Sequence, residues 1–353
     1  AGDISVKEND RVLQWSNYSF DGSTYDIYSS LLSGAGLYLI KDDWASNADE
    51  LTRIIEEKKI TVCFLTTALF NALVDVQPEA LRGMRKILFG GEMVSLSHVS
   101  RAFTVLGEGK IVHVYGPTET TVYATGYPVY EIKKDGSIPI GKPLSNTSLY
   151  VLNESMNPVP VGVSGELYIG GDGVSLGYVN NPELNKEKFI NNPFSKNKNN
   201  QDRLYRTGDI VRWLPEGTIE YLGRIDDQVK IRGYRIELSE IESILLENEK
   251  VRQAVVIAKT DKQTGTKKLV CYIVVKEVFD KGEIVSYLKV RLPDYMVPVV
   301  WVEMKNLPLN TSGKVDKNAL PEPDISELLN NEYEAPRNKT EEDLASIWKE
   351  LLH

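Results

Sequence analysis

Helix-like and strand-like patterns of apolar residues alternate through the first third of the chain. Asp49–Lys59 carries Leu and Ile at helical spacing, which predicts a helix. Three short apolar runs follow, at Ile60–Leu65, Lys86–Phe89 and Lys110–Val114, and each predicts a buried strand. Buried strands that alternate with helices are typical of a mostly parallel sheet. The pattern therefore predicts an α/β fold for this part.

The pattern changes between about residues 138 and 225, where short strand-like runs are separated by Gly and Pro turns. In Arg212–Tyr221, Pro215 and Gly217 mark the turn of a hairpin. These features predict an antiparallel, barrel-like part. The polar run Ser195–Arg203 has no apolar period and is interpreted as a surface loop.

A small α+β unit is predicted after Asp226. Its first elements are a strand at Gln228–Leu238 and a helix at Glu240–Asn248, with Ser239 and Glu242 as a capping box. Further strands are expected at 253–258, 269–275 and near 299–304, with a helix near 283–291.

The last part of the chain reads as a linker followed by one helix. Residues 321–340 are polar and contain Pro, as expected of a linker. From Thr340 an amphipathic helix places its apolar residues on one face: Leu344, Ile347, Trp348 and Leu351. The chain ends soon afterwards, so we expect the first helix of a further domain.

Length and charge narrow the functional classes. At 353 residues, two domains are expected. With 41 Lys and Arg against 50 Asp and Glu the net charge is −9, so no general attraction to nucleic acid or to a membrane is expected. No apolar run is long enough to span a bilayer. A bound phosphate therefore requires a local site.

The cysteines and histidines predict neither a disulfide nor a zinc site. Cys63 and Cys271 lie in apolar runs and are interpreted as buried thiols of a cytoplasmic protein. The three histidines, His98, His113 and His353, are too scattered for a metal cluster.

Two short motifs match known sites only in part. Gly136–Lys142 resembles the start of a phosphate-binding loop, but Pro143 replaces the hydroxyl residue that would hold magnesium. Gly173–Gly177 matches a nucleophile elbow around Ser175, yet no good helix start follows. Ser175 is therefore interpreted as a turn residue.

Three polar segments carry candidate chemistry. Tyr115–Thr121 places a Gly-Pro turn directly after a strand, where α/β sheets bind ligands. Tyr205–Asp209 offers a carboxylate suited to a ribose diol, and Lys314 lies on a Gly-containing loop that could bring a cation to a phosphate. Alone, each could equally be a solvated turn or a surface residue.

Seven segments in one order resemble the core motifs of the adenylation domains of nonribosomal peptide synthetases, which are adenylate-forming enzymes. They are Phe20–Ser23, Tyr115–Glu119, Gly165–Val174, Tyr205–Asp209, Gly223–Gly233, Leu292–Pro298 and Ser312–Asp316. The resemblance runs from about residue 5 to 323. It implies a large AMP-binding part at 1–225, with an α/β sheet and a distorted β-barrel, and a small mobile α+β domain at 226–323. Residues 324–353 resemble a linker and the start of a peptidyl carrier domain.

The family reaction joins an amino acid to ATP as aminoacyl-AMP and then loads it as a thioester on the phosphopantetheine of a carrier. The resemblance implies that Lys314, Thr118 and Glu119 act in catalysis, with Glu119 also holding Mg²⁺. It implies that ATP is bound by Gly91, Tyr115, Asp209, Tyr221 and Arg224, with the two tyrosines stacking on adenine. Asp226 matches the hinge of the small domain, and Gly233 lies in the segment that would face the carrier arm.

The resemblance also implies an amino-acid pocket. Asp21 would bind the α-ammonium group, and the remaining positions are Gly22, Tyr25, Phe64, Leu88, Gly90, Val114, Val122 and Tyr123. Apart from Asp21 and Lys314 the pocket has no charged group to meet a charged substrate. We expect a branched aliphatic substrate, with isoleucine ahead of leucine and valine.

Some alternatives stay open. The chain starts after the position of the family's Gly-rich phosphate-binding loop, so its independent activity is uncertain and an uncovered apolar face is expected. An acyl-CoA or aryl-acid ligase of the same superfamily would not need Asp21, and a catalytically silent docking module would show no exchange of pyrophosphate. Expected partners are a carrier domain and a condensation domain of the same synthetase. The need for an MbtH-like helper protein is left open.

Overall fold

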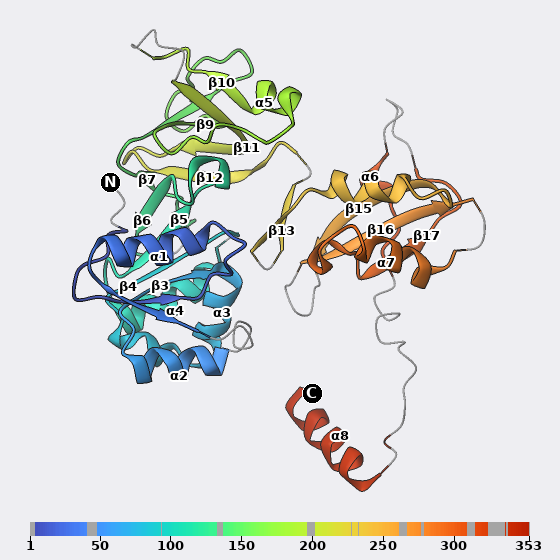
Figure 1. The fold of residues 1–353 in the computed structure, drawn as a ribbon, viewed down its shortest axis with the longest axis horizontal. Coiled ribbons are helices and arrows are strands. Elements are labelled where there is room, and N and C mark those ends of the chain that lie inside the picture. The colour runs from blue at the N-terminus through green and yellow to red at the C-terminus, as the bar shows by residue number, and fades with distance from the viewer. Residues whose placement is uncertain are drawn as a thin grey trace. The chain divides into compact units, whose positions relative to one another are not determined.

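The computed structural model describes residues 4–40, 48–92, 94–132, 137–195, 202–226, 228–231, 233–260, 267–276, 279–308, 315–323, 336 and 338–352. Its internal contacts divide the chain into two compact units. Unit 1 is Ala1–Arg235 and unit 2 is Ile236–His353. Each is described by itself (Figure 1).

The first half of unit 1 forms a mostly parallel sheet, as predicted, and the structure shows that this sheet has seven strands. Its strands lie in the order β2 (Gly36–Leu39), β1 (Arg11–Gln14), β3 (Val62–Thr66), β4 (Lys86–Gly90), β5 (Ile111–Tyr115), β6 (Thr125–Pro128) and β7 (Lys142–Pro143). The first five run parallel, and β6 and β7 run antiparallel to their neighbours. The carboxyl ends of β3, β4 and β5 therefore meet at one edge.

Helices cover the two faces of this sheet (Figure 1). The helices α2 (Ala48–Lys58), α3 (Thr67–Val76) and α4 (Leu96–Leu106) share one core with alternate residues of the strands, such as Cys63 and Phe89. Helix α1 (Gly22–Leu32) packs on the opposite face, where its Tyr25 joins a second core with Val62 and Leu88. Both faces are buried because side chains alternate along each strand.

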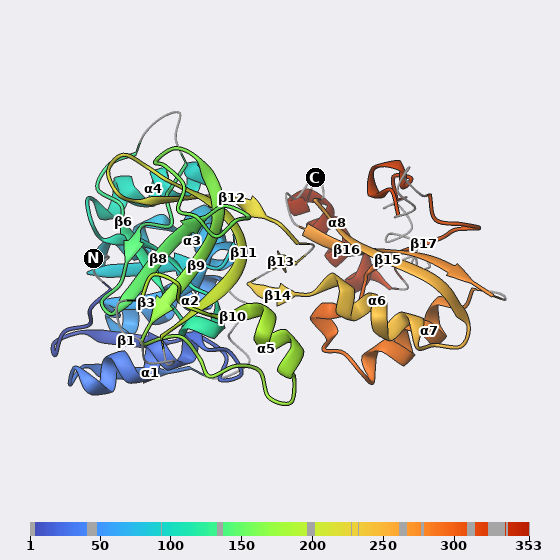
Figure 2. The ribbon, with the colours of Figure 1, turned by 90° about the horizontal axis from the view of Figure 1, so that it is seen from above.

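The second half of unit 1 is an antiparallel sheet. It contains β8 (Thr147–Leu152), β9 (Ser164–Gly171), β10 (Phe189–Asn191), β11 (Arg203–Trp213) and β12 (Ile219–Arg224), with the short helix α5 (Pro182–Lys188) beside it. Strands β8, β9 and β11 lie side by side (Figure 2), while β10 and β12 pair with successive parts of the long β11. The predicted hairpin is formed by β11 and β12.

This sheet is open rather than a closed barrel in the part that the structure describes. Its β12 edge meets the first sheet through one bridge, Gly141 to Ile219, just before β7. This bridge joins the two sheets. The part predicted to be barrel-like is therefore an open antiparallel sheet that adjoins the β7 edge of the parallel sheet.

Two local predictions after Asp226 are wrong. The single strand expected at Gln228–Leu238 is two short strands that pair with each other, β13 (Val229–Ile231) and β14 (Tyr234–Ile236). Gly233, with φ of +83°, permits the reversal between them. The helix α6 (Leu238–Leu246) starts earlier than expected, with Glu237 as its N-cap. Ser239 therefore lies inside the first turn, and Glu242 accepts a hydrogen bond from the Val256 amide instead of forming a capping box.

Unit 2 has a three-stranded sheet of β15 (Val251–Thr260), β16 (Lys267–Val275) and β17 (Val300–Glu303), with α6 and α7 (Lys281–Lys289). These elements match the predicted α+β unit. The helix α8 (Lys339–Leu352) begins close to the predicted Thr340, and its Leu344 and Trp348 are exposed.

The two cysteines are free and buried, as predicted. Burial raises the pKa of each thiol, so neither behaves as a reactive thiolate. Among the described helices, none has the length and apolar character required to cross a bilayer.

Candidate functional site

The parallel strands bring predicted site residues to one edge. Thr66 of β3 pairs in register with Gly90 of β4, and Gly90 pairs with Val114 of β5. The chain then turns at Gly116 and Pro117 into a short 3-10 helix, Thr118–Thr120. Ligands of open α/β sheets bind at such an edge, so the position of Tyr115 to Glu119 agrees with the turn expected there.

Asp209, Arg224 and Tyr115 form one polar cluster. Asp209 and Arg224 face each other across β11 and β12, and Arg224 Nη1 donates to Asp209 Oδ1 at 2.6 Å. The Tyr115 hydroxyl donates to the other carboxylate oxygen. Burial raises the pKa of Asp209, although Arg224 and Tyr115 oppose the rise. The three residues assigned to the nucleotide from distant segments thus lie together.

Arg224 links this cluster to the predicted hinge residue. Its Nε and Nη2 donate to the two carboxylate oxygens of Asp226 at 2.6 and 2.7 Å, a bidentate pairing that fixes the guanidinium plane. Arg224 also donates to the Thr207 carbonyl at 3.0 Å. Tyr221 packs with Tyr115 against the same apolar cluster of the antiparallel sheet.

Glu119 is buried and uses both carboxylate oxygens. Its Oε1 accepts a hydrogen bond from the Tyr178 hydroxyl at 2.5 Å, and its Oε2 accepts one from Arg235 Nη1 at 2.7 Å. Burial alone would raise the pKa of Glu119, but the Arg235 charge and the Tyr178 hydroxyl outweigh it and hold that pKa below its ordinary value. The carboxylate therefore stays ionised. Thr118, its neighbour, is exposed.

The backbone directly after this turn is strained. Thr121 and Val122 have φ of +63° and +66°, a region that β-branched residues seldom adopt. The strain is maintained by local contacts, including the hydrogen bond of Thr121 Oγ1 to the Gly173 carbonyl at 2.7 Å. It directs Val122 and Tyr123 into the core beneath α1.

Most residues of the predicted amino-acid pocket lie in one apolar cluster on the α1 face of the parallel sheet. The cluster includes Tyr25, Phe64, Leu88, Val114, Val122 and Tyr123. The Tyr123 ring contacts the rings of Tyr25 and Phe64, with centroids 5.3 and 5.4 Å away. Asp21 is the N-cap residue of α1 and makes no side-chain cap hydrogen bond. The structure thus gathers residues that lie a hundred positions apart.

Two glycines in this region have little room for a side chain. A Cβ on Gly90 would lie 2.1 Å from the Val114 carbonyl oxygen, and one on Gly22 would lie 3.0 Å from Ser16 Oγ and 3.4 Å from the Phe64 ring. Gly91 differs, because its φ of +98° favours glycine while the surrounding space is open.

A buried carboxylate that the sequence analysis did not mark, Asp26, lies next to the aromatic cluster of Tyr25, Phe64 and Tyr123. Asp26 of α1 is fully buried, and its Oδ2 accepts a hydrogen bond from the Ser16 amide at 3.2 Å. Burial raises the pKa of Asp26 to about 7. Burial also raises the pKa of Tyr123, with Asp26 the next contributor. No sequence motif marked Asp26, because a carboxylate inside an amphipathic helix usually faces solvent.

The β13–β14 hairpin reaches the same edge of the parallel sheet. The Gly233 amide donates to the Glu92 carboxylate, and a Cβ on Gly233 would lie 2.7 Å from Thr66 Cγ2. Lys230 of β13 is partly buried, and burial lowers its pKa, which Asp209 partly restores. The sequence analysis assigned no role to Lys230, which lies within the Gly223–Gly233 motif, or to Arg235 and Tyr178, which lie outside the seven motifs.

One central prediction lies outside the described residues. Lys314 belongs to 309–314, which the structure does not describe. Of the discarded motifs, Lys142 and Pro143 lie in β7. The Ser175 amide donates to the Glu119 carbonyl at 2.9 Å within a loop, as expected of a turn residue.

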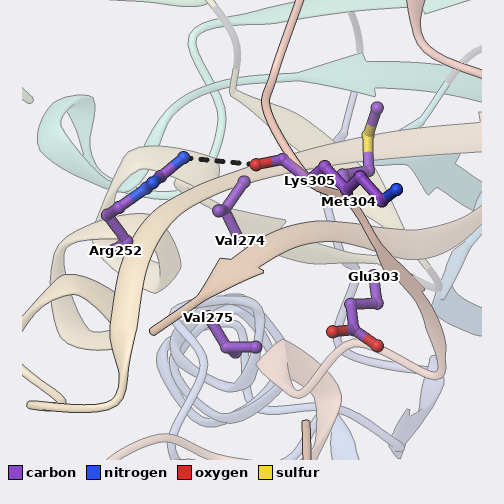
Figure 3. A pocket seen from close by; sticks show the side chains of 6 residues that line it. All are labelled: Arg252, Val274, Val275, Glu303, Met304 and Lys305. Carbon is purple, nitrogen blue, oxygen red and sulfur yellow. Dashed lines mark hydrogen bonds between the residues drawn. The ribbon is translucent and has the colours of Figure 1, made fainter. Parts of the chain in front are cut away.

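A separate pocket of about 420 Å³ lies in unit 2 (Figure 3) and contains none of the predicted site residues. Arg252 spans it and donates to the Lys305 carbonyl at 3.2 Å and to Asn306 Oδ1 at 2.7 Å. The other lining side chains are Val274, Val275, Glu303 and Met304. Opposite charges line this hollow, so it has no clear preference for a charged ligand.

The fold is that of an α/β protein, and its predicted turn Tyr115 to Glu119 lies at the carboxyl edge of the parallel sheet, where open α/β sheets generally bind ligands. Comparison with known families agrees. The family model of the AMP-binding enzyme matches residues 1–179, and that of the AMP-binding enzyme C-terminal domain matches residues 240–314. The chain belongs to the AMP-binding enzyme family.

Individual relatives refine this assignment. The chain is 48% identical over 352 residues to bacitracin synthase 1 of Bacillus licheniformis, covering 99% of this chain and 7% of that protein. It is 47% identical to surfactin synthase subunit 3 of Bacillus subtilis, covering 99% and 27%. The solved structure of holo-PA1221, described as an NRPS protein containing adenylation and PCP domains, is similar with a TM-score of 0.78 and 30% identity, over 90% of this chain and 54% of that one. The resemblance to adenylation domains of nonribosomal peptide synthetases is confirmed, and the chain spans a small part of its curated relatives.

Proposed function

We propose that the chain activates an amino acid with ATP as the adenylation unit of a nonribosomal peptide synthetase. The substrate carboxylate attacks the α-phosphorus of ATP, the bond to the β-phosphate oxygen breaks, and aminoacyl-AMP and pyrophosphate form. The thiol of a phosphopantetheine arm then attacks the acyl carbon and releases AMP. The main support is the joint position of the Asp209 cluster, Glu119 and the pocket on the α1 face, all built around one sheet edge.

In this proposal the Asp209 carboxylate accepts hydrogen bonds from the ribose hydroxyls. Arg224 and Tyr115 hold that carboxylate in a fixed orientation, which reduces the entropy lost when nucleotide binds. Tyr115 and Tyr221 offer ring faces for adenine, and Gly91 leaves open space beside the backbone.

Glu119 and Thr118 would act at the phosphates. A buried, ionised carboxylate is a suitable ligand for Mg²⁺, and the lowered pKa of Glu119 supports that role. Among the described residues no group of three acidic, His or Cys side chains could hold a metal. A single carboxylate with phosphate oxygens and water is a usual way to bind Mg²⁺. The ion would neutralise phosphate charge, and Lys314 would stabilise charge on the substrate carboxylate and α-phosphate.

The pocket on the α1 face favours an aliphatic side chain. Asp21 would bind the α-ammonium group, while Leu88, Val114 and Val122 would contact the side chain. Gly22 and Gly90 let their neighbours pack closely at this face, because a Cβ would crowd Ser16 and Phe64 at Gly22 and the Val114 carbonyl at Gly90. We propose isoleucine as the substrate, ahead of leucine and valine, which differ from it by small packing energies.

The second half-reaction requires further parts. We propose that residues 226–323 form a mobile domain that turns at Asp226, and that 324–353 lead into a carrier domain whose first helix is α8. A condensation domain of the same synthetase and an MbtH-like helper are further proposed partners. The buried free thiols support a cytoplasmic setting.

Exchange of labelled pyrophosphate into ATP tests this function directly. Exchange should be highest with isoleucine and should be lost with Lys314→Ala, whereas Lys289→Ala at the exposed end of α7 should keep it. The deaminated analogue 3-methylpentanoate should support far less exchange, because Asp21 would lack its cationic partner. Equal exchange with the deaminated acid would indicate an acyl-acid ligase instead. No exchange from a folded chain would favour a docking module.

A further inference from the structure

The buried carboxylate of Glu119 is oriented by a tyrosine from a different segment of unit 1. The Tyr178 hydroxyl donates to Glu119 Oε1 at 2.5 Å, and Arg235 donates to Oε2. The two oxygens of a carboxylate offer about four lone pairs, so Glu119 can still bind a cation through the others. The bond from Tyr178 therefore fixes the plane of the carboxylate without closing it to a metal.

Tyr178 is itself fixed at its backbone and at its ring. Asn185, in the short helix α5, accepts a hydrogen bond from the Tyr178 amide at 2.6 Å and donates one to the Tyr178 carbonyl at 2.8 Å. The Tyr178 ring packs edge-on against Phe189, with ring centroids 5.4 Å apart. Contacts at both ends of the residue leave the hydroxyl little freedom to move.

The loop that carries Tyr178 is attached to Glu119 a second time. The Ser175 amide donates to the Glu119 carbonyl at 2.9 Å, so backbone and side chain of Glu119 both contact this loop. Leu176 and Val179, which lie on either side of Tyr178, are 92% and 88% exposed. Tyr178 is thus the side chain that this loop directs inward, towards the carboxylate.

We propose that Tyr178, held by Asn185, is a positioning residue that orients the Glu119 carboxylate towards the divalent cation that accompanies ATP. The assignment of Glu119 to the metal rests on the proposed function. Groups that hydrogen-bond a metal ligand set its orientation, and their loss commonly weakens metal binding. Tyr178 contacts the ligand rather than the metal, so its effect passes through Glu119.

The first test measures metal binding without any turnover. Binding of Mn²⁺ with the non-hydrolysable analogue AMPCPP to the whole chain is followed by electron paramagnetic resonance, with a protein-free titration subtracted. Tyr178→Phe removes the hydroxyl and keeps the ring that packs on Phe189. It should weaken Mn²⁺ binding by about tenfold. Binding of AMPCPP in EDTA should be unchanged, whereas general damage to the site would weaken it too.

Two controls show whether the effect passes through Glu119. Tyr168→Phe is the matched variant, because the Tyr168 hydroxyl also donates to a carboxylate, that of Glu166, at 3.2 Å. It should leave Mn²⁺ binding unchanged. In a Glu119→Gln background, Tyr178→Phe should have no further effect, since the ligand that it orients is already lost.

A second variant tests the support behind Tyr178. Asn185→Ala removes both bonds to the Tyr178 backbone and should weaken Mn²⁺ binding in the same direction. Combined with Tyr178→Phe it should add little, because both changes release the same carboxylate. Thermal unfolding of each variant shows that it is folded.

The outcomes separate this inference from the proposed function. Weaker Mn²⁺ binding by Tyr178→Phe, lost in the Glu119→Gln background, supports the positioning role even if no amino acid supports pyrophosphate exchange. Mn²⁺ binding that falls with Glu119→Gln but not with Tyr178→Phe or Asn185→Ala overturns the positioning role alone. Mn²⁺ binding that is insensitive to Glu119→Gln overturns both this role and the proposed metal ligand.

Discussion

At the scale of single residues, Asp26 is the clearest case of a group whose surroundings set its chemistry. It is fully buried in α1, and burial raises its pKa to about 7, against an ordinary value of 3.8. The folded chain therefore binds this proton more tightly than the unfolded chain. The resulting stabilisation is complete below pH 4 and is lost as pH rises through about 7.

Asp26→Asn should remove this dependence. The side-chain oxygen introduced by Asp26→Asn can still accept a hydrogen bond from the Ser16 amide, and no buried charge develops. The unfolding free energy of the variant, relative to that of wild type, should therefore rise by up to about 4 kcal/mol between pH 4 and 8. Urea unfolding of unit 1 at several pH values measures the difference. Asp75→Asn is the opposite control, because Arg101 and His98 hold the pKa of Asp75 below its ordinary value and stability should fall at pH 8. A difference for Asp26→Asn that is flat with pH would contradict the interpretation.

Gly90 tests how closely the pocket is built. In Gly90→Ala the new Cβ would meet the Val114 backbone oxygen at 2.1 Å, and β5 must shift. We expect a loss of roughly 1–3 kcal/mol in the unfolding free energy and a strong fall in amino-acid-dependent exchange. Gly83→Ala is the control, since nothing lies within 4 Å of its Cβ. Two variants of equal stability and activity would show that the contact is not as tight as described.

Individual residues also mark the limits of sequence reasoning. Asp209 and Tyr115 could be found because each stands in a motif with a definite spacing. Tyr178 and Arg235 could not, because their contacts with Glu119 span 59 and 116 positions. Neither residue type is unusual at its position, so only the folded chain reveals the pairing.

At the scale of elements, the junction between the two sheets of unit 1 depends on Gly141. Its φ is +99°, and an added Cβ would lie 2.2 Å from the Gly126 carbonyl oxygen. Gly141→Ala should lower the unfolding free energy of unit 1 more than Gly217→Ala. At Gly217, φ is also positive but the space is open, so the cost there is about 1 kcal/mol of backbone strain. Similar losses in the two variants would show that crowding at the junction contributes little.

The strands and helices of the parallel sheet were predictable because both faces are buried and the apolar runs are continuous. The β13–β14 hairpin was not, because an alternating run interrupted by Gly233 fits one strand or two. The capping box predicted at Ser239 was also wrong, because a short pattern fits more than one position of the helix start. The motif is short, and α6 begins before it.

At the scale of the whole molecule, the division into two units predicts two unfolding events. Leu245→Ala creates a cavity in the buried core of unit 2 and should cost roughly 2–5 kcal/mol there. Calorimetry should show that only one transition moves, while Gly90→Ala moves the other. A single transition shifted by both substitutions would contradict the division.

The two-part α/β and α+β architecture followed from the change in apolar pattern along the chain. The meeting of distant motifs at one sheet edge followed from the resemblance, since composition and periodicity carry no information on which loops meet. The open form of the antiparallel sheet required the structure itself.

Amino-acid activation is tested most directly by measuring pyrophosphate exchange by this chain with each of the twenty amino acids, with thermal unfolding to show that the chain is folded. We expect the highest exchange with isoleucine, lower exchange with leucine and valine, and little with charged amino acids, because Asp21 and Lys314 are the only charged groups assigned to the pocket. Strong exchange with a charged amino acid, or none with any amino acid, would contradict this expectation.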